Sequence, residues 1–189
     1  WHILKSYSLY NINEFIICCG YKGHVIKEYF SNYLLYNSDI TVSLDSQNIT
    51  MHQTNIEPWK ITLVDTGNNT ETAGRLLRVK DYLKEDLFCF TYGDGLSNVN
   101  INKLIETHKK SDSTLTLTAV QPPGRFGSLE IENNLVKKFV EKPKGDNSRI
   151  NGGYFVVHQK VFNLIEGDSN SWEFDILPKL AQRLELNSY

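Results

Sequence analysis

Short apolar runs that end abruptly at glycine-containing turns are the feature that most constrains the fold of this 189-residue chain. The runs 14–19, 60–65 and 87–91 are rich in Ile, Leu, Val, Phe and Cys, and a glycine follows each of them closely. Runs of this length and composition are typical of buried strands. Apolar residues recur at helical spacing in 25–34 and 74–83, between these strands. The alternation predicts an α/β fold with a mostly parallel, doubly wound, Rossmann-like sheet.

The rest of the chain continues this pattern and adds one different unit. The runs 127–131 and 136–140 follow a Pro-Pro-Gly sequence and predict a small β-hairpin insertion. No internal repeat or low-complexity linker is present, so residues 1–189 are predicted to form a single domain. The other expected elements are extended pieces at 40–44 and 50–52, a helix over 101–108 capped by Asn100, strands at 114–120 and 153–157, and two final helical stretches, the second containing Pro178.

Composition excludes several functional classes. A net charge of −2 and a pI near 6.2 give no basic footprint, so no nucleic-acid partner is expected. No apolar run approaches the ~18 residues of a membrane span, and no signal-peptide pattern is present, so no membrane association is expected. Cys18, Cys19 and Cys89 are odd in number and lie inside apolar runs, which favours reduced thiols in a cytoplasmic protein.

Asp94 is the most informative polar residue, because it follows the strand 87–91 and lies between Gly93 and Gly95. Ligands of open α/β sheets bind at the carboxyl ends of the strands, and glycines allow a close approach to the backbone. Mg²⁺ prefers one or two carboxylates and completes its coordination with water and substrate phosphates. The sequence therefore indicates a Mg²⁺ site at Asp94, with an ordinary Asp-Gly turn as the alternative.

The segment 72–75 (TAGR) is a candidate binding segment at the start of a helix. Backbone N–H groups at such a position are expected to be free to contact a ligand. The alternative is that Thr72 only caps the helix.

Three later motifs also have two explanations each. The segment 123–127 (PGRFG) is either a binding segment or a glycine turn. The adjacent charges of 141–143 (EKP) are either functional or an exposed ion pair. The two glycines in 151–153 (NGG) either weaken a strand or clear space for a ligand.

In this order, TAGR, YGDG, RFG, EKP and NGG resemble the sugar-nucleotide nucleotidylyltransferases, the pyrophosphorylases that activate sugar 1-phosphates. The resemblance extends from Trp1 to about residue 184 and is carried also by FIICCGYKG, LVDTG, VQPPGRFG and INGGYF. It is strongest to members that use CTP and α-D-glucose 1-phosphate. It implies a nucleotidyltransferase fold, Mg²⁺ as cofactor, CDP-glucose and pyrophosphate as products, and a homo-oligomer for the full-length protein. It also implies a supply of CDP-glucose for deoxysugars of bacterial surface polysaccharides such as lipopolysaccharide O-antigen.

The resemblance further implies roles for individual residues. Asp94 and Lys142 are expected to be catalytic, Asp94 as the Mg²⁺ ligand and Lys142 as the cation that neutralises the sugar phosphate. The nucleotide is expected at Thr72, Arg75 and Gly93. The residues expected on the sugar-phosphate side are Phe126, Gly127, Glu141, Lys142, Asn151 and Gly152.

Arg75 is our hypothesis for the choice of base. A guanidinium only donates hydrogen bonds, and cytosine offers acceptors at O2 and N3 where uracil has a donor at N3. The alternative is that Arg75 packs its stem along the helix and pairs with a nearby acid.

Two segments of the family pattern lie outside this sequence: the GGxGTR loop that holds the triphosphate, and a second metal-binding Asp. We therefore expect a fragment, truncated at both ends, with part of the active site and little activity of its own. Two other functions stay open. A metal-dependent glycosyltransferase is disfavoured, because such enzymes usually show two carboxylates one residue apart. The other alternative is a non-catalytic regulatory or assembly subunit of the same fold.

Overall fold

The chain forms two compact units in the computed structural model, which describes residues 1–122, 128–140 and 149–189. Unit 1 consists of Trp1–Glu85 and Phe162–Lys179, and unit 2 consists of Asp86–Val161 and Leu180–Tyr189. The expected single domain over residues 1–189 stays a prediction.

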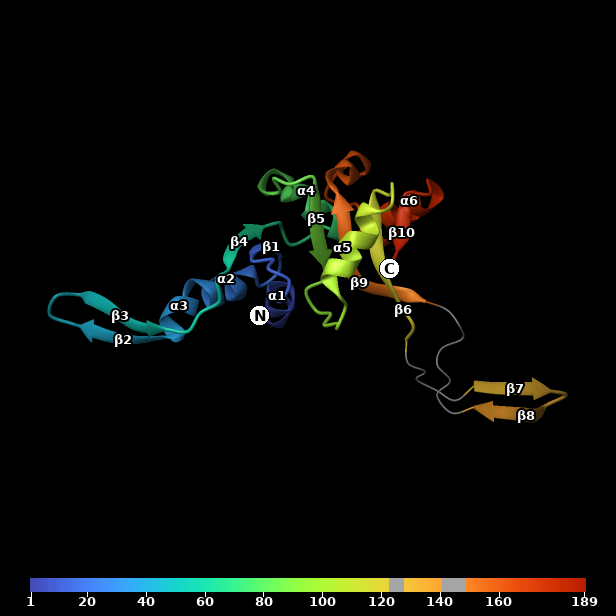
Figure 1. Cartoon of the computed structure of the whole chain (residues 1–189), viewed down its shortest axis with the longest axis horizontal. Helices are drawn as coiled ribbons and strands as arrows, with labels where there is room; N and C mark the ends of the chain where they lie inside the picture. The colour runs from blue at the N-terminus through green and yellow to red at the C-terminus, as the bar shows by residue number, and fades with distance from the viewer. Residues whose placement is uncertain (123–127, 141–148) are drawn as a thin grey trace. The chain divides into compact units, whose positions relative to one another are not determined.

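Unit 1 is built on two parallel strands, β1 (Glu14–Cys19) and β4 (Lys60–Asp65) (Figure 1). Both strands were predicted with these bounds. Parallel neighbours need a long crossover connection, and the chain between them supplies one that contains two helices. Because the strands are parallel and in register, their carboxyl ends at Cys19 and Asp65 lie side by side. The helical elements of unit 1 are α1 (His2–Ser8), α2 (Gly23–Ser31), α3 (Tyr33–Tyr36), α4 (Thr72–Arg78), the 3₁₀ turn η1 (Lys80–Tyr82) and the π turn η3 (Trp172–Ile176).

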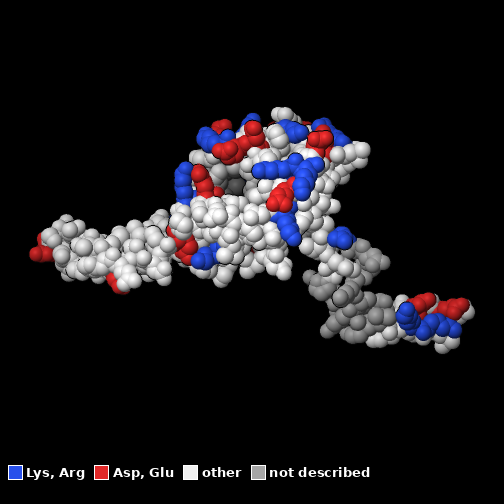
Figure 2. Space-filling view, in the orientation of Figure 1, with Lys and Arg blue, Asp and Glu red and all other residues white. Residues whose placement is uncertain are grey.

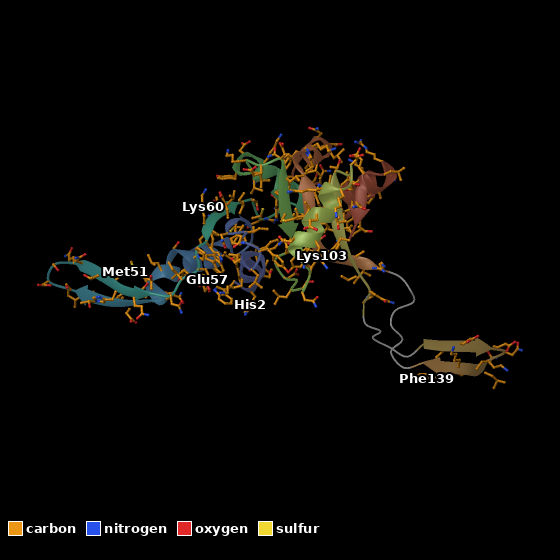
Figure 3. The ribbon with its side chains drawn as sticks, viewed as in Figure 1. His2, Met51, Glu57, Lys60, Lys103 and Phe139 are labelled. Atoms are coloured by element: carbon orange, nitrogen blue, oxygen red, sulfur yellow. The ribbon has the colours of Figure 1, made fainter. Side chains whose placement is uncertain are left out.

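The extended pieces expected at 40–44 and 50–52 form an antiparallel ribbon of β2 (Ser38–Ser43) and β3 (Asn48–Thr54). Cross-strand partners lie on the same face of a ribbon. One face of this ribbon is apolar, and its side chains are between 41% and 50% exposed; Met51 is marked in Figure 3. These side chains are Ile40, Val42, Ile49 and Met51.

An aromatic cluster with one carboxylate stabilises unit 1 around Trp59. Trp59 packs edge-on against Phe15 with ring centroids 6.1 Å apart and contacts Tyr33 at 6.2 Å. The Tyr33 hydroxyl donates to Glu57, which is labelled in Figure 3. Lys5 Nζ lies 3.1 Å from the same carboxylate, and the Glu57 side chain is only 15% exposed. The hydrogen bond from Tyr33 outweighs the opposing effect of burial and lowers the pKa of Glu57.

Unit 2 contains a four-stranded sheet in the order β10, β6, β9, β5. Strand β10 is parallel to β6, and β9 is antiparallel to both β6 and β5. Three of the four strands point the same way, but because β9 lies between β6 and β5, only one of the three pairings is parallel. The predicted α/β class is confirmed, and this sheet is mixed rather than mostly parallel. The strands are β5 (Leu87–Thr91), β6 (Leu115–Val120), β9 (Ile150–His158) and β10 (Leu186–Ser188).

The connections explain the direction of β9. Helix α5 (Ile101–Lys109) crosses over from β5 to β6, which keeps these two strands parallel. In the described part of the chain, only a hairpin lies between β6 and β9, and β9 returns antiparallel. The predicted cap is confirmed, because Asn100 Oδ1 accepts a hydrogen bond of 3.0 Å from the Lys103 N–H.

The predicted hairpin insertion is confirmed as β7 (Ser128–Glu132) and β8 (Leu135–Val140). Asn133 and Asn134 join the strands with φ of 48° and 64°, the left-handed geometry of a tight hairpin turn. Figure 2 shows charged side chains of both signs on this hairpin.

The two helical stretches expected after β9 are irregular. The first is the 3₁₀ segment η2 (Gln159–Leu164), and the second is the π turn η3 followed by α6 (Leu177–Gln182). Pro178 has no N–H for the carbonyl of Phe174 one turn earlier, which explains why this stretch is not one regular α-helix. None of the helices among residues 1–122, 128–140 and 149–189 is long and apolar enough to cross a membrane.

We expect Glu57→Gln to lower the free energy of unfolding by about 1–3 kcal/mol at neutral pH, because Tyr33 and Lys5 lose a charged acceptor. The pKa of Glu57 is lower in the folded than in the unfolded chain. Its stabilising contribution is therefore fully present above the unfolded-state pKa, about 4.3, and is lost as the pH falls through the folded-state pKa. Chemical denaturation of both proteins between about pH 3 and pH 7 measures this difference.

The matched control is Glu14→Gln. Glu14 pairs with Lys60 at 2.7 Å, but the two side chains are 64% and 73% exposed. This substitution should change the free energy of unfolding by less than about 1 kcal/mol. Equal destabilisation by the two substitutions would contradict the special role of Glu57.

Candidate active site

Asp94 lies in an exposed turn directly after β5 in unit 2. Within the described residues, its carboxylate makes no hydrogen bond. The turn is held at both sides, because the Tyr92 N–H donates to a backbone carbonyl at 3.3 Å and Gly95 O accepts from the Tyr154 hydroxyl at 3.1 Å. Among the described residues, no atom lies within 4 Å of where a Cβ would be at Gly93 or Gly95. The exposed carboxylate therefore stands on an anchored turn whose two glycines have open space beside them.

The predicted segment 151–153 lies beside this turn, because Tyr154 of β9 pairs with Thr91 of β5. Asn151 is exposed, and its Nδ2 donates to the Tyr92 hydroxyl at 3.2 Å. The structure thus brings together two motifs that were predicted separately.

Both glycines of this segment are required by packing within the protein. A Cβ at Gly152 would lie 2.6 Å from Thr118 Oγ1 of β6. Gly153 has a φ of +77°, and a Cβ there would lie 2.9 Å from the ring of Tyr92. The glycines therefore allow β9 to approach its neighbours closely, which is a structural reason for the motif.

The described residues contain no group of three or more His, Cys, Asp or Glu that could hold a metal ion. Mg²⁺ does not require such a cage, because it binds through one or two carboxylates together with water and substrate phosphates. The single exposed carboxylate of Asp94 fits a cation of this kind.

Unit 1 contains a cavity of about 490 Å³ at the carboxyl ends of β1 and β4. It is a pocket open to solvent with a largely polar lining, at the strand ends where ligand sites of α/β sheets form. The sequence analysis did not predict any of the residues that line it as site residues. The glycines after the runs 14–19 and 60–65 could have indicated the site, because they mark the ends of two strands, and ligands bind where such ends lie side by side. The lining includes Cys19, Lys22, His24, Lys27, Asp65 and Asn68.

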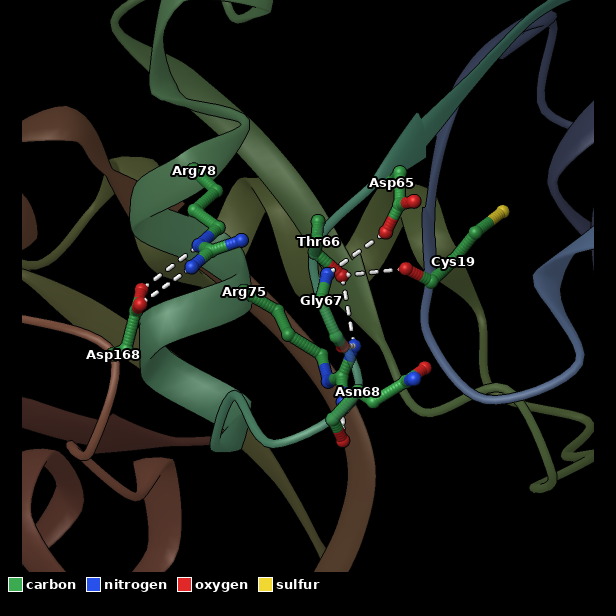
Figure 4. Close-up of polar contacts among 8 residues, drawn as sticks. All are labelled: Cys19, Asp65, Thr66, Gly67, Asn68, Arg75, Arg78 and Asp168. Carbon is green, nitrogen blue, oxygen red and sulfur yellow. Dashed lines mark hydrogen bonds and ion pairs between the residues drawn. The ribbon is translucent and has the colours of Figure 1, made fainter.

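Arg75 of α4 holds the loop that follows β4 (Figure 4). Its Nη1 donates to Thr66 Oγ1 at 2.8 Å and to Gly67 O at 2.7 Å, and its Nη2 donates to Asn68 O at 3.3 Å. A Cβ on Gly20 would lie 2.4 Å from Nη1, so the guanidinium passes directly over this glycine. Two further guanidinium N–H groups, one on Nε and one on Nη2, make no hydrogen bond among the described residues.

The alternative in which Arg75 pairs with an acid does not match this geometry, because its partners are a hydroxyl and two carbonyls. The acid pair belongs instead to Arg78, one turn further along α4, whose Nε and Nη2 both donate to Asp168 (Figure 4). These hydrogen bonds raise the pKa of Arg78 and lower that of Asp168.

The expectation of free N–H groups at the start of α4 is wrong for Ala73 and Gly74. The N–H groups of Ala73 and Gly74 donate to Asn170 O at 3.1 and 3.2 Å, and the Glu71 N–H donates to Asp168 O at 2.8 Å. A segment far away in the sequence therefore occupies donors that the helix itself leaves unpaired.

The alternative explanation, in which Thr72 only caps the helix, does not match the structure. The N-cap position belongs to Glu71, without a side-chain capping bond. The Thr72 hydroxyl instead donates to Glu173 at 2.9 Å and accepts from the Trp172 N–H at 2.8 Å. It joins α4 to η3, and its predicted role at the nucleotide stays a prediction.

The three cysteines, Cys18, Cys19 and Cys89, are free thiols in the structure. Burial raises the pKa of Cys18 and of Cys89 to about 11 and also raises that of Cys19. Thiols with such pKa values are neutral at physiological pH and are poor nucleophiles.

Four predicted residues of the sugar-phosphate side lie outside the described residues, and their roles stay predictions: Phe126, Gly127, Glu141 and Lys142.

Comparison with known proteins gives one consistent result. The chain matches the family model described as nucleotidyl transferase over residues 1–188. It is 50% identical to the glucose-1-phosphate cytidylyltransferases of Salmonella typhi and Salmonella typhimurium over 190 residues, covering 100% of this chain and 74% of each relative. The crystal structure of HddC from Yersinia pseudotuberculosis has a TM-score of 0.65 and 20% identity, covering 100% of this chain and 74% of HddC, and this likeness supports the fold alone. The chain therefore belongs to the nucleotidyl transferase family, within the group of the glucose-1-phosphate cytidylyltransferases.

Proposed function

We propose that this chain belongs to an enzyme that makes CDP-glucose and pyrophosphate from CTP and α-D-glucose 1-phosphate. The observation that carries this proposal is the 50% identity over the whole chain to two glucose-1-phosphate cytidylyltransferases. The exposed carboxylate of Asp94 beside Asn151, and the cavity at the ends of β1 and β4, are consistent with it.

The test is pyrophosphate release by the full-length protein with every pairing of CTP, UTP or GTP with glucose 1-phosphate or mannose 1-phosphate. CTP with glucose 1-phosphate should give a kcat/KM at least about tenfold above every other pairing, as expected when a site is built around one base. A preference for GTP or for mannose 1-phosphate would contradict the proposal.

The reaction needs alignment and charge neutralisation more than acid–base chemistry. An oxygen of the sugar phosphate attacks the α-phosphorus of CTP in line with the departing pyrophosphate. A phosphate monoester is already ionised at neutral pH, so no general base is required. The oxygen–phosphorus bond to the sugar phosphate forms as the bond to pyrophosphate breaks, and no covalent enzyme intermediate is needed.

Asp94 is the residue that we propose to hold Mg²⁺, with Gly93 beside the nucleotide. When bound, Mg²⁺ supplies positive charge to phosphate oxygens. The hydrogen bonds on both sides of Asp94 hold the backbone of its turn at the end of β5.

Arg75 is the residue that we propose to distinguish cytosine from other bases. Its Nη1 is fixed by Thr66 and Gly67, so the direction of the remaining Nε and Nη2 N–H groups is also fixed. Donors of fixed direction suit the O2 and N3 acceptors of cytosine and oppose the N3–H of uracil. Thr72 is proposed on the same nucleotide side.

The sugar phosphate is proposed to lie at Asn151 and Gly152, together with the segments around Phe126-Gly127 and Glu141-Lys142. Lys142 would neutralise the phosphate, and Glu141 would accept hydrogen bonds from sugar hydroxyls. A homo-oligomeric state and a cytoplasmic location are also proposed, the latter consistent with three free cysteines.

Asp94→Asn in the full-length protein should reduce Mg²⁺-dependent turnover by about 100-fold or more, because an amide keeps the shape but loses the charge that attracts the cation. Steady-state kinetics across a Mg²⁺ titration measure this. The control is Asp112→Asn, an acidic residue after α5 that should leave turnover unchanged. Turnover within a few-fold of wild type would leave Asp94 as an ordinary turn residue.

Lys142→Ala should raise the KM for glucose 1-phosphate by roughly tenfold or more and leave that for CTP nearly unchanged, because one charge-assisted contact to the sugar phosphate is lost. The KM values for both substrates provide the measurement. The control Lys138→Ala, a lysine of β8, should change neither. Equal effects on both substrates would remove Lys142 from this role.

Arg75→Ala should narrow the preference for CTP over UTP, because CTP loses a contact that UTP cannot match at N3. The ratio of kcat/KM for the two nucleotides, in wild type and variant, is the measurement. Arg78→Ala, one turn further along α4, is the matched control and should keep the wild-type ratio. An unchanged ratio in Arg75→Ala would place base choice elsewhere.

A further inference from the structure

Tyr92 joins the turn that carries Asp94 to the strand that carries Asn151. It comes two residues before Asp94, and its N–H donates to Gly153 O at 3.3 Å. Its hydroxyl accepts a hydrogen bond of 3.2 Å from Asn151 Nδ2. Backbone and side chain of one residue therefore hold both the turn and the exposed carboxamide.

The ring of Tyr92 is fixed by its packing contacts. It packs edge-on against Phe155 with centroids 5.5 Å apart and against Phe90 at 6.1 Å. On its other side lies Gly153, where a Cβ would come within 2.9 Å of the ring. Edge-to-face contacts of this kind fix the ring plane, and so they fix where the hydroxyl lies.

The orientation of the Asn151 carboxamide follows from its two partners. Its Oδ1 accepts from the Gly153 N–H at 2.9 Å, and only an oxygen can accept there. Its Nδ2 then faces the Tyr92 hydroxyl and uses one of its two N–H groups. The second N–H has no hydrogen-bond partner among the described residues, and Asn151 is exposed.

The direction of this amide determines what it can bind. Phosphate oxygens only accept hydrogen bonds, and a flipped carboxamide would present an oxygen to them. The Gly153 N–H makes the flipped state unfavourable, because it would then face an NH₂ group. A correctly oriented donor is therefore available before the ligand arrives.

We propose that Tyr92 is a positioning residue for recognition of the sugar phosphate. Its hydroxyl and its seated ring hold the Asn151 carboxamide with one N–H directed to a phosphate or hydroxyl oxygen of the ligand. This inference rests on the proposed function, in which Asn151 contacts glucose 1-phosphate.

The test is Tyr92→Phe in the full-length protein, which removes the hydroxyl and keeps the ring in its seat. The KM for glucose 1-phosphate should rise roughly three- to tenfold, as expected for one neutral hydrogen bond, while the KM for CTP and the thermal unfolding midpoint stay near wild type. Tyr36→Phe is the matched control, because Tyr36 is 73% exposed in unit 1, and it should change neither KM.

A double-mutant cycle tests the route through Asn151. In an Asn151→Ala background, Tyr92→Phe should have no further effect on the KM for glucose 1-phosphate, because the group that it orients is gone. Fully additive effects would overturn the proposed route, and so would an equal rise in both KM values or an unchanged KM in Tyr92→Phe. Failure of the wild-type protein to form CDP-glucose would overturn the proposed function, and this inference with it, before any variant is compared.

Discussion

The antiparallel position of β9 between β5 and β6 is the constraint on which the candidate site in unit 2 depends. In an antiparallel pair, the start of one strand meets the end of its neighbour. Asn151, at the start of β9, therefore meets Tyr92, just past the end of β5, although the two are 59 residues apart in the sequence. A parallel β9 would place them at opposite edges of the sheet. The same constraint explains the glycines, because β9 must lie against Thr118 on one side and Tyr92 on the other.

Unit 1 also brings polar groups together at one edge of a sheet, but it does so with parallel strands. Its strands β1 and β4 are parallel, so both carboxyl ends meet at one edge and a cavity forms there. The loop after β4 needs a support from outside the sheet, and Arg75 supplies it through three hydrogen bonds to oxygens of that loop. The two units thus hold their polar groups by different means: backbone pairing fixes Asn151 and the Asp94 turn, and one guanidinium fixes the loop 66–68.

Many of the strands, caps and turns of the fold could be predicted from the local sequence. Apolar runs, cap residues and turn residues act over a few positions in the sequence. They allowed the prediction of the strands 14–19 and 60–65, the cap at Asn100 and the hairpin around Asn133. Contacts between segments that lie far apart in the sequence could not be predicted. The start of α4 looks open in the sequence, but Asn170 closes it from almost a hundred residues away. The partners of Arg75 and the lining of the cavity depend on how loops fold back, which no periodicity reveals. The proposed roles of Asp94 and Lys142 come from the family pattern and its chemistry, and they stay proposals.

The chemical character of the described residues agrees with a reaction that depends on alignment. Cys18 and Cys89 are kept neutral by burial, with pKa values near 11, so these thiols do not provide a nucleophile. His108 is buried against Thr116, and burial lowers its pKa, so its imidazole is neutral and occupied in the core. The groups placed at the candidate sites are of another kind: a carboxylate, a guanidinium and a carboxamide, the last two held in direction by fixed partners. None of these groups has to exchange a proton with the phosphates: a carboxylate can hold a cation, and a guanidinium and a carboxamide donate hydrogen bonds. In-line attack by a phosphate that is already ionised depends on such alignment, together with the cationic groups that offset its charge.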